Sequence, residues 1–165
     1  QGWRSSDHEG TWRMIERRII TQALLAAAEG AGKPIGLSQS PTTGGWQGEP
    51  NTDGTNFTPY SVITPNASSA TTGFAEGPIS EWQADWRLSY TISSFGVMPE
   101  QCEWMADTVR FLVDGLTNTS IDPGVNTYLV QQVRVDALGG LVRVDATEPP
   151  YWGQSDQITI WLSEE

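Results

Sequence analysis

The sequence predicts an α+β fold in which two helices pack on a mainly antiparallel or mixed β-sheet. Two segments repeat apolar residues at the helical period, and several others alternate apolar and polar residues at the period of a strand. Along the chain the predicted order is helix, strand, strand, helix, strand, strand, strand. Strands with one polar face and helices with one apolar stripe bury their apolar sides together, which favours helices on one face of the sheet.

The chain has 165 residues, which fits one domain with its own core. Residues 1–13 show no sustained period and are interpreted as an N-terminal arm. Residues 14–165 are interpreted as a single α+β domain.

The first helix is predicted over residues 15–29. Ile15, Ile19, Ala23 and Ala26 form one apolar stripe, and a second set of apolar residues lies beside it. Glycines at positions 30 and 32 end the helix, as is common at helix C-termini.

A long loop is predicted at about residues 33–58, because this stretch is rich in Gly, Pro, Ser, Thr and Asn. A loop of this length is uncommon inside a compact domain, so it is either disordered or ordered by a neighbouring molecule. Two strands are predicted after it. Residues 60–64 form a short one, and residues 86–95 alternate apolar and polar side chains.

The second helix is predicted to start at Pro99 and to end at Gly115. Its apolar residues recur at positions i, i+3, i+4 and i+7, from Cys102 through Val109 to Val113. Charged residues occupy the opposite side at spacings that favour ion pairs. The helix is therefore expected to pack one face on the sheet and to expose the other.

A long β-hairpin is predicted in residues 128–145, where the sequence VRVD occurs at 133–136 and again at 142–145. With Gly139 and Gly140 as a two-residue turn, Asp136 pairs with Arg143 and Arg134 with Asp145. Apolar pairs then fall on the other face, so one register satisfies both kinds of side chain. Residues 157–162 supply the last strand.

The composition disfavours several functions. The chain holds 20 Asp and Glu against nine Lys and Arg, giving a formal net charge of -11, which argues against gripping nucleic acid through phosphates. One cysteine and one histidine exclude an intramolecular disulfide framework and the common zinc sites. The longest apolar stretch, residues 23–28, is far below a membrane span, so we expect a soluble, unsecreted protein without a cofactor.

Catalytic motifs are weak. Acidic pairs suited to glycoside hydrolysis fall on the predicted outer face of the second helix. His8 is the only base for a nucleophilic triad and lies in the arm, while Cys102 falls in an apolar stripe. Asp53 lies within NTDGTN (residues 51–56), a stretch similar to a calcium loop that has no terminal Glu at the required position. The sequence therefore favours a protein that is not an enzyme.

The tryptophans divide by context. Trp86, Trp104 and Trp161 lie in predicted helices and strands, where they are expected to be buried or half-buried. Aromatic residues in loops or the arm are typical of interface anchors, and we assign that role to Trp3, Trp12, Trp46, Phe57 and Trp152. A carbohydrate-binding module also carries aromatics on loops, and that alternative stays open.

Four segments together resemble the tail terminator proteins of long-tailed, siphovirus-type bacteriophages. They are MIERR (residues 14–18), SSFG (93–96), QCEWMADTVR (101–110) and QITIWL (157–162). The resemblance spans about residues 14–163 and rests on the order and local sequence of the elements. The long loop and the arm depart from the compact pattern of that family.

The resemblance implies a structural virion protein without enzymatic activity or cofactor. Its expected partners are other copies in a homohexameric ring, the tail tube protein and the head–tail connector (stopper) protein. Such a ring ends tail-tube polymerisation, joins the tail to the head and leaves a channel for DNA, without sequence-specific DNA binding or membrane contact. The protein is expected at the head-proximal end of the tail, after assembly in the host cytoplasm. Another connector component, such as a head-closure or minor tail protein, is the alternative.

Overall fold

The computed structural model describes residues 16–41, 58–67, 69–70, 86–121, 127–145 and 150–164. These form two helices, α2 (Arg17–Ala28) and α3 (Pro99–Asp114), with a short 3-10 turn, η1 (Glu29–Ala31), after α2. The eight strands are β1 (Ile35–Leu37), β2 (Tyr60–Pro65), β3 (Ser69–Ala70), β4 (Trp86–Gly96), β5 (Ser120–Ile121), β6 (Tyr128–Ala137), β7 (Val142–Val144) and β8 (Tyr151–Glu164). The predicted α+β class is confirmed.

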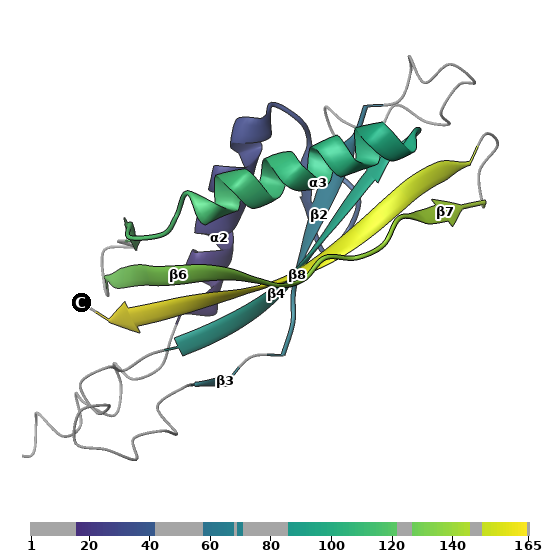
Figure 1. Cartoon of the computed structure of the whole chain (residues 1–165). Helices are drawn as coiled ribbons and strands as arrows, with labels where there is room; N and C mark the ends of the chain where they lie inside the picture. The colour runs from purple at the N-terminus through teal and green to yellow at the C-terminus, as the bar shows by residue number, and fades with distance from the viewer. Residues whose placement is uncertain are drawn as a thin grey trace, which may run out of the picture.

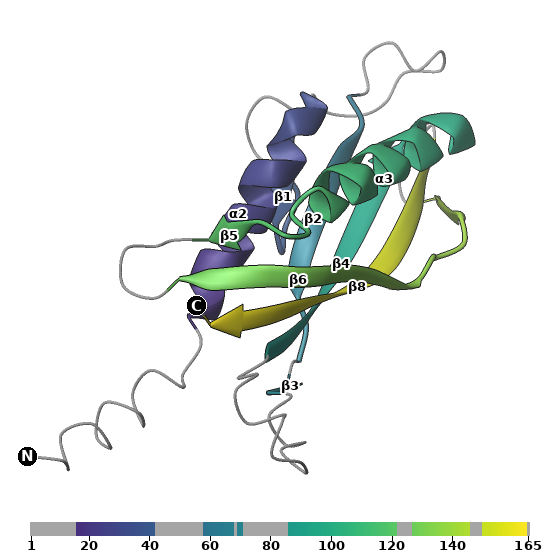
Figure 2. The same cartoon turned by 60° about the vertical axis from the view of Figure 1, so that its left-hand side comes forward.

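The strands form one twisted sheet in the order β1-β2-β4-β8-β6-β5, with β3 beside β4 and β7 beside β8. Only β1 and β2 pair in parallel, so the sheet is mixed but mostly antiparallel. Its centre is the pairing of β4 with β8, which runs without interruption from Trp86 opposite Leu162 to Gly96 opposite Trp152. Both helices lie on one face of this sheet (Figures 1 and 2). We call the other side the open face.

The helices follow from their sequence. Pro99 occupies the first turn of α3 and Gly115 caps its end, as predicted. Gly32 has φ +68° at the end of η1, a left-handed conformation that favours glycine. The buried stripe of α2 is Ile20, Leu24 and Ala28, adjacent to the predicted one.

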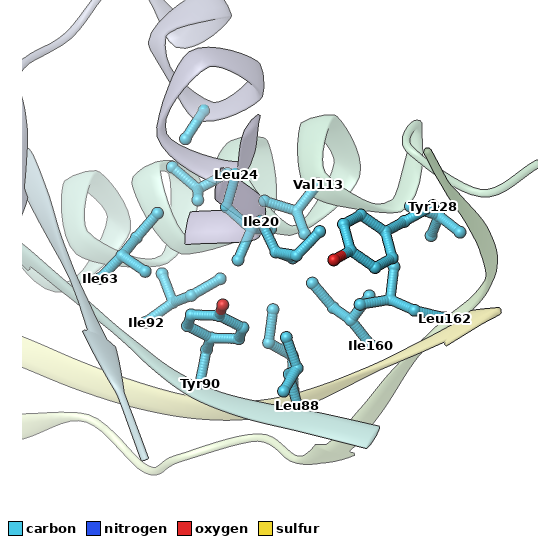
Figure 3. Close-up of a cluster of buried hydrophobic side chains, with 14 of the residues drawn as sticks. Ile20, Leu24, Ile63, Leu88, Tyr90, Ile92, Val113, Tyr128, Ile160 and Leu162 are labelled. Atoms are coloured by element: carbon cyan, nitrogen blue, oxygen red, sulfur yellow. The ribbon is translucent and has the colours of Figure 1, made fainter. Parts of the chain in front are cut away.

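The core fills the space between the two helices and the sheet (Figure 3). It takes apolar side chains from every second position of the central strands, such as Leu88, Tyr90 and Ile92 of β4. Val109 and Val113 of α3 close it from above. Tyr90 is buried with its hydroxyl 2.9 Å from the Thr21 hydroxyl of α2, so the polar end of this ring is also satisfied.

The predicted hairpin is wrong. β6 and β7 each pair antiparallel with β8, β6 along residues 157–164 and β7 along residues 151–153. Chain reversal occurs instead between β7 and β8, where Val144 lies opposite Tyr151. β8 is long enough to hydrogen-bond both segments, and this long-range pairing replaces the local one.

The charged pairs of that hairpin are therefore different from those predicted. Arg134 pairs with Asp136 within β6, with 2.7 Å between Nε and Oδ1, and Arg143 pairs with Asp145 at 3.0 Å between the corresponding atoms. The predicted cross-strand pairs, Asp136 with Arg143 and Arg134 with Asp145, do not form. In each VRVD segment the arginine pairs with the acid two positions later, and Asp145 lies directly after the end of β7.

The long loop predicted at residues 33–58 contains a strand, β1, which the sequence did not suggest because only three residues pair. Its residues 42–57 lie outside the described part, as does the whole predicted arm at 1–13. Within the described part, no helix combines the length and apolar character needed to cross a membrane.

Candidate functional site

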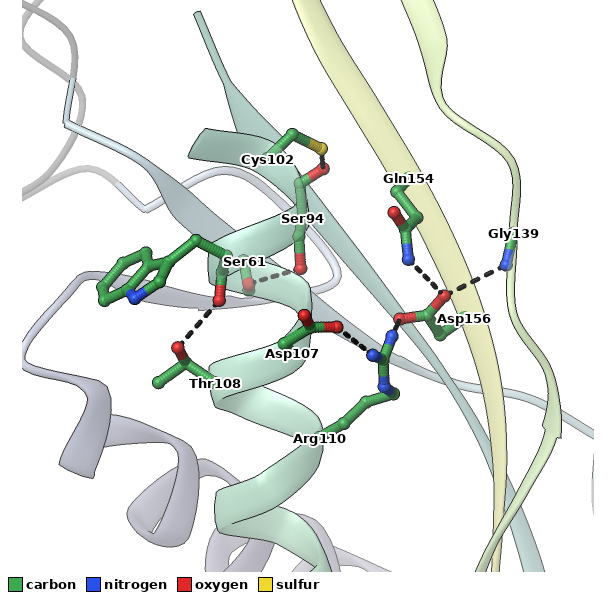
Figure 4. Close-up of polar contacts among 10 residues, drawn as sticks. Ser61, Ser94, Cys102, Asp107, Thr108, Arg110, Gly139, Gln154 and Asp156 are labelled. Carbon is green, nitrogen blue, oxygen red and sulfur yellow. Dashed lines mark hydrogen bonds and ion pairs between the residues drawn. The ribbon is translucent and has the colours of Figure 1, made fainter. Parts of the chain in front are cut away.

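A buried carboxylate, Asp156 of β8, is the most enclosed charged group that the structure describes (Figure 4). Arg110 of α3 donates from Nη1 to Asp156 Oδ2 at 2.8 Å. The other oxygen, Oδ1, accepts from the Gly139 backbone N–H and from Gln154 Nε2, both at 3.0 Å. Three segments distant in sequence therefore meet at one carboxylate whose two oxygens are both occupied.

This cluster was not predicted as a unit. The sequence placed Arg110 among the outward ion pairs of the second helix, and it does pair there with Asp107. The same guanidinium also reaches inward to Asp156, 46 positions away in the sequence. Because both oxygens of Asp156 are engaged and the group is sealed from solvent, it serves to fix α3 on the sheet.

Cys102 is a buried thiol at the start of α3. Its Sγ donates to the carbonyl oxygen of Ser94 at 3.3 Å, and the Ser94 hydroxyl lies 2.8 Å from that of Ser61 (Figure 4). Burial raises the pKa of the thiol to about 12, with smaller contributions from the negative charges of Asp156 and Glu103. At neutral pH Cys102 is protonated and packed, as the apolar stripe predicted.

The outer side of α3 is both aromatic and acidic. Phe111 is 78% exposed and Trp104 is 46% exposed, and both lie on the side of the helix opposite the buried stripe. The exposed side chains of this surface, which we call the α3 ridge, are Glu100, Glu103, Trp104, Asp107, Phe111 and Asp114. The one basic residue of the helix, Arg110, pairs with both Asp107 of the ridge and the buried Asp156, so the net charge of the ridge is negative.

A shallow hollow of about 430 Å³ adjoins the N-terminal end of this ridge. The exposed apolar side chains of Met98 and Trp104 line it, together with Lys33 and Pro59. The hollow extends the apolar surface beyond the helix itself.

The open face of the sheet carries a basic and aromatic cluster. Trp161 of β8 lies between two arginines from the flanking strands, with the guanidinium carbon of Arg87 5.5 Å and that of Arg134 5.6 Å from the ring centroid. These distances are those of cation–π contacts. We call Arg87, Trp161 and Arg134 the Trp161 patch.

Beside the Trp161 patch, the open face carries hydroxyl and amide groups that bond to one another. Towards the other end of β4 it carries a second apolar cluster, made of Tyr60, Val62, Phe95, Val97 and Tyr151. Thr91 donates to Gln157 Oε1 at 3.0 Å, and Asn66 Nδ2 donates to the same oxygen at 3.1 Å. Ser93 and Ser155 are joined at 2.9 Å between hydroxyl oxygens, and Thr159 donates to Asp136. These hydroxyl and amide groups therefore have partners, whereas the buried Trp161 Nε1 has no hydrogen-bond partner among the described residues.

Of the predicted interface anchors, Trp152 alone lies in the described part. It is half-buried in β8, opposite Gly96 on one side and Arg143 on the other. Trp3, Trp12, Trp46 and Phe57 lie outside the described residues. Trp86 and Trp161 are half-buried, as expected. The expectation that Trp104 packs inside the fold is wrong, because its side chain is exposed. The helical period could have shown this, because it places Trp104 on a different side of the helix from Met105 and Val109.

Among the described residues, no group of three or more His, Cys, Asp or Glu side chains is arranged to hold a metal ion. No protein-family model and no curated protein sequence matches this chain.

Proposed function

We propose that this chain is a structural subunit of a bacteriophage virion that assembles with copies of itself into a ring at the junction of head and tail. In this proposal it acts as a tail terminator, capping the tail tube and contacting the head connector while DNA passes through the ring. The proposal starts from the sequence resemblance over residues 14–163. The observation that carries it further is the α3 ridge.

Phe111 and Trp104 are large aromatics on solvent-facing positions of a well-formed helix. A monomer gains little from exposing them, and aromatic residues framed by polar ones are typical of interface hot spots. Burial of an aromatic side chain removes about 150–250 Å² from water, so two of them form a useful centre for a protein–protein contact.

A second apolar surface lies along the outer edge of the sheet. Val135 of β6, Val142 of β7 and the intervening Leu138 are all exposed. In the described part, β6 pairs on its outer side only with β5, at Tyr128 and Leu129. An exposed apolar edge is a liability for an isolated domain and is commonly covered in an assembly.

The net charge of -11 supports a role beside DNA rather than on it. Repeated around a ring, this charge gives a strongly negative surface that repels the phosphates of a passing duplex. The same charge keeps the free subunit soluble before assembly.

Native mass spectrometry and negative-stain electron microscopy of the purified chain test the assembly. We expect a closed oligomer with a central channel, whereas a monomer at all concentrations contradicts the proposal. Within an infected culture, tails made while capsid assembly is blocked distinguish the roles. A terminator is present at one end of such tails, and a head-closure protein is absent from them.

A further inference from the structure

We propose that copies of this chain associate head to tail, with the acidic α3 ridge of one copy seated on the basic Trp161 patch of the next. The inference rests on the proposed self-assembly and specifies its interface. The occupant of the patch is a second copy, and charge complementarity between the two surfaces is the reason for that choice.

The two surfaces are complementary in chemistry. The α3 ridge presents exposed acids around Trp104 and Phe111, and the single cation of the helix, Arg110, is shared between Asp107 and the buried Asp156. The Trp161 patch presents two guanidinium groups on one indole ring. Asp136 lies beside this patch, where it pairs with Arg134 and accepts a hydrogen bond from Thr159. Arginines already oriented by an aromatic ring lose less freedom on meeting a carboxylate than unrestrained ones.

The two surfaces lie on opposite sides of the fold. α3 covers one face of the sheet, and its ridge points away from that face, while Arg87, Trp161 and Arg134 lie on the open face. A contact between them therefore leaves one unused ridge and one unused patch at the two ends of any pair. Such a heterologous contact repeats until a ring closes. A ridge facing a second ridge would instead bring like charges together, which disfavours the symmetric alternative.

The experiment uses two variants of the full chain. Arg87→Glu with Arg134→Glu reverses the patch and keeps the ridge, and Trp104→Ser with Phe111→Ser removes the apolar centre of the ridge and keeps the patch. Each variant alone is expected to need at least about 100-fold more protein for half-assembly than the native chain. Circular dichroism and thermal unfolding verify that each variant is folded.

Mixing the two variants is the decisive step. One intact ridge on the first variant and one intact patch on the second allow a single contact, so native mass spectrometry should show a heterodimer and nothing larger. A mixture that remains monomeric overturns the inference.

Matched controls address charge and apolarity in general. Arg18 is an exposed arginine of α2 that belongs to neither surface, so Arg18→Glu should assemble like the native chain. Leu37→Ser removes an exposed apolar residue from β1 with the same expected result. If the native chain forms a ring and both double variants still assemble normally, this interface is wrong while the proposed function stands. If the native chain never assembles, both fail.

Discussion

Arg110 of α3 and Asp156 of β8 form an ion pair across the helix–sheet interface, with 2.8 Å between Nη1 and Oδ2. Asp156 is fully buried, and Arg110 is largely so. Taking both charges out of water is costly, and the pair recovers that cost through the further hydrogen bonds from Gly139 and Gln154 to the carboxylate. The pair therefore connects three features: the position of α3, the path of β8 and the passage from β6 to β7.

Replacing Arg110 by Met should destabilise the fold by about 3 to 5 kcal/mol, because it leaves a buried carboxylate without its cation. Urea unfolding followed by circular dichroism measures the change. Asp107→Asn provides the control, since Asp107 is exposed and pairs with the same guanidinium; it should cost less than about 1 kcal/mol. An equal decrease in unfolding free energy for the two variants would show that the buried pair of Arg110 with Asp156 stabilises the fold no more than the exposed pair with Asp107.

The elements with strong periodicity could be predicted from the sequence. α3 begins at Pro99 and ends before Gly115, as its stripe and its capping residues indicated, and β4 keeps the predicted alternation to Phe95. Both are local patterns, in which the spacing of apolar residues along the chain is enough to indicate which side chains are buried. The shortest strands, such as β1, were missed because three paired residues leave no period to read.

The pairing of β6 and β7 and the residue clusters of the site could not be predicted from the sequence, for a different reason. The VRVD repeat satisfies many antiparallel registers, and only the three-dimensional structure shows that β8 takes both copies as partners. Likewise, Asp156 is one acid among twenty until Arg110 approaches it from another element. Trp161 becomes a cluster only because β4 and β6 bring an arginine to each side. These features depend on which distant segments pair with one another, and the spacing of residues along the chain does not show those partners.

Gly139 and Gly140 provide a direct test of how the chain passes from β6 to β7. A Cβ at Gly139 would fall on the backbone carbonyl oxygen of Ser155 in β8, whereas a Cβ at Gly140 has no atom within 4 Å. Gly139→Ala should therefore destabilise the protein by roughly 1 to 3 kcal/mol through overpacking. Gly140→Ala should change the unfolding free energy by no more than about 0.5 kcal/mol.

The comparison separates two structures for this segment. In a two-residue hairpin turn of type I′ both glycines would take φ above zero, and both alanines would be strained. Comparable destabilisation of the two variants in urea unfolding would thus favour the hairpin over the path along β8.

Cys102 should make the protein less stable as the pH rises. Its pKa in the fold is about 12, against an ordinary value of 9.0, because burial disfavours the thiolate. A raised pKa means that the folded state holds the proton more tightly than the unfolded chain. The stability contribution is therefore complete below pH 9 and declines between pH 9 and 12, by about 1.4 kcal/mol per pH unit in that window.

Unfolding free energies of the native chain and of Cys102→Ala, measured in urea from pH 7 to 10.5, isolate this effect. At pH 7 the variant should be less stable by roughly 1 kcal/mol, from lost packing. Above pH 9 the free energy of unfolding of the native chain should fall more steeply, by about 2 kcal/mol at pH 10.5, so the difference closes and then reverses. Burial also raises the pKa of Tyr60 and Tyr90, which adds a decline above pH 10. Because both proteins keep these tyrosines, parallel curves throughout would mean that the thiol ionises as easily in the fold as in the unfolded chain.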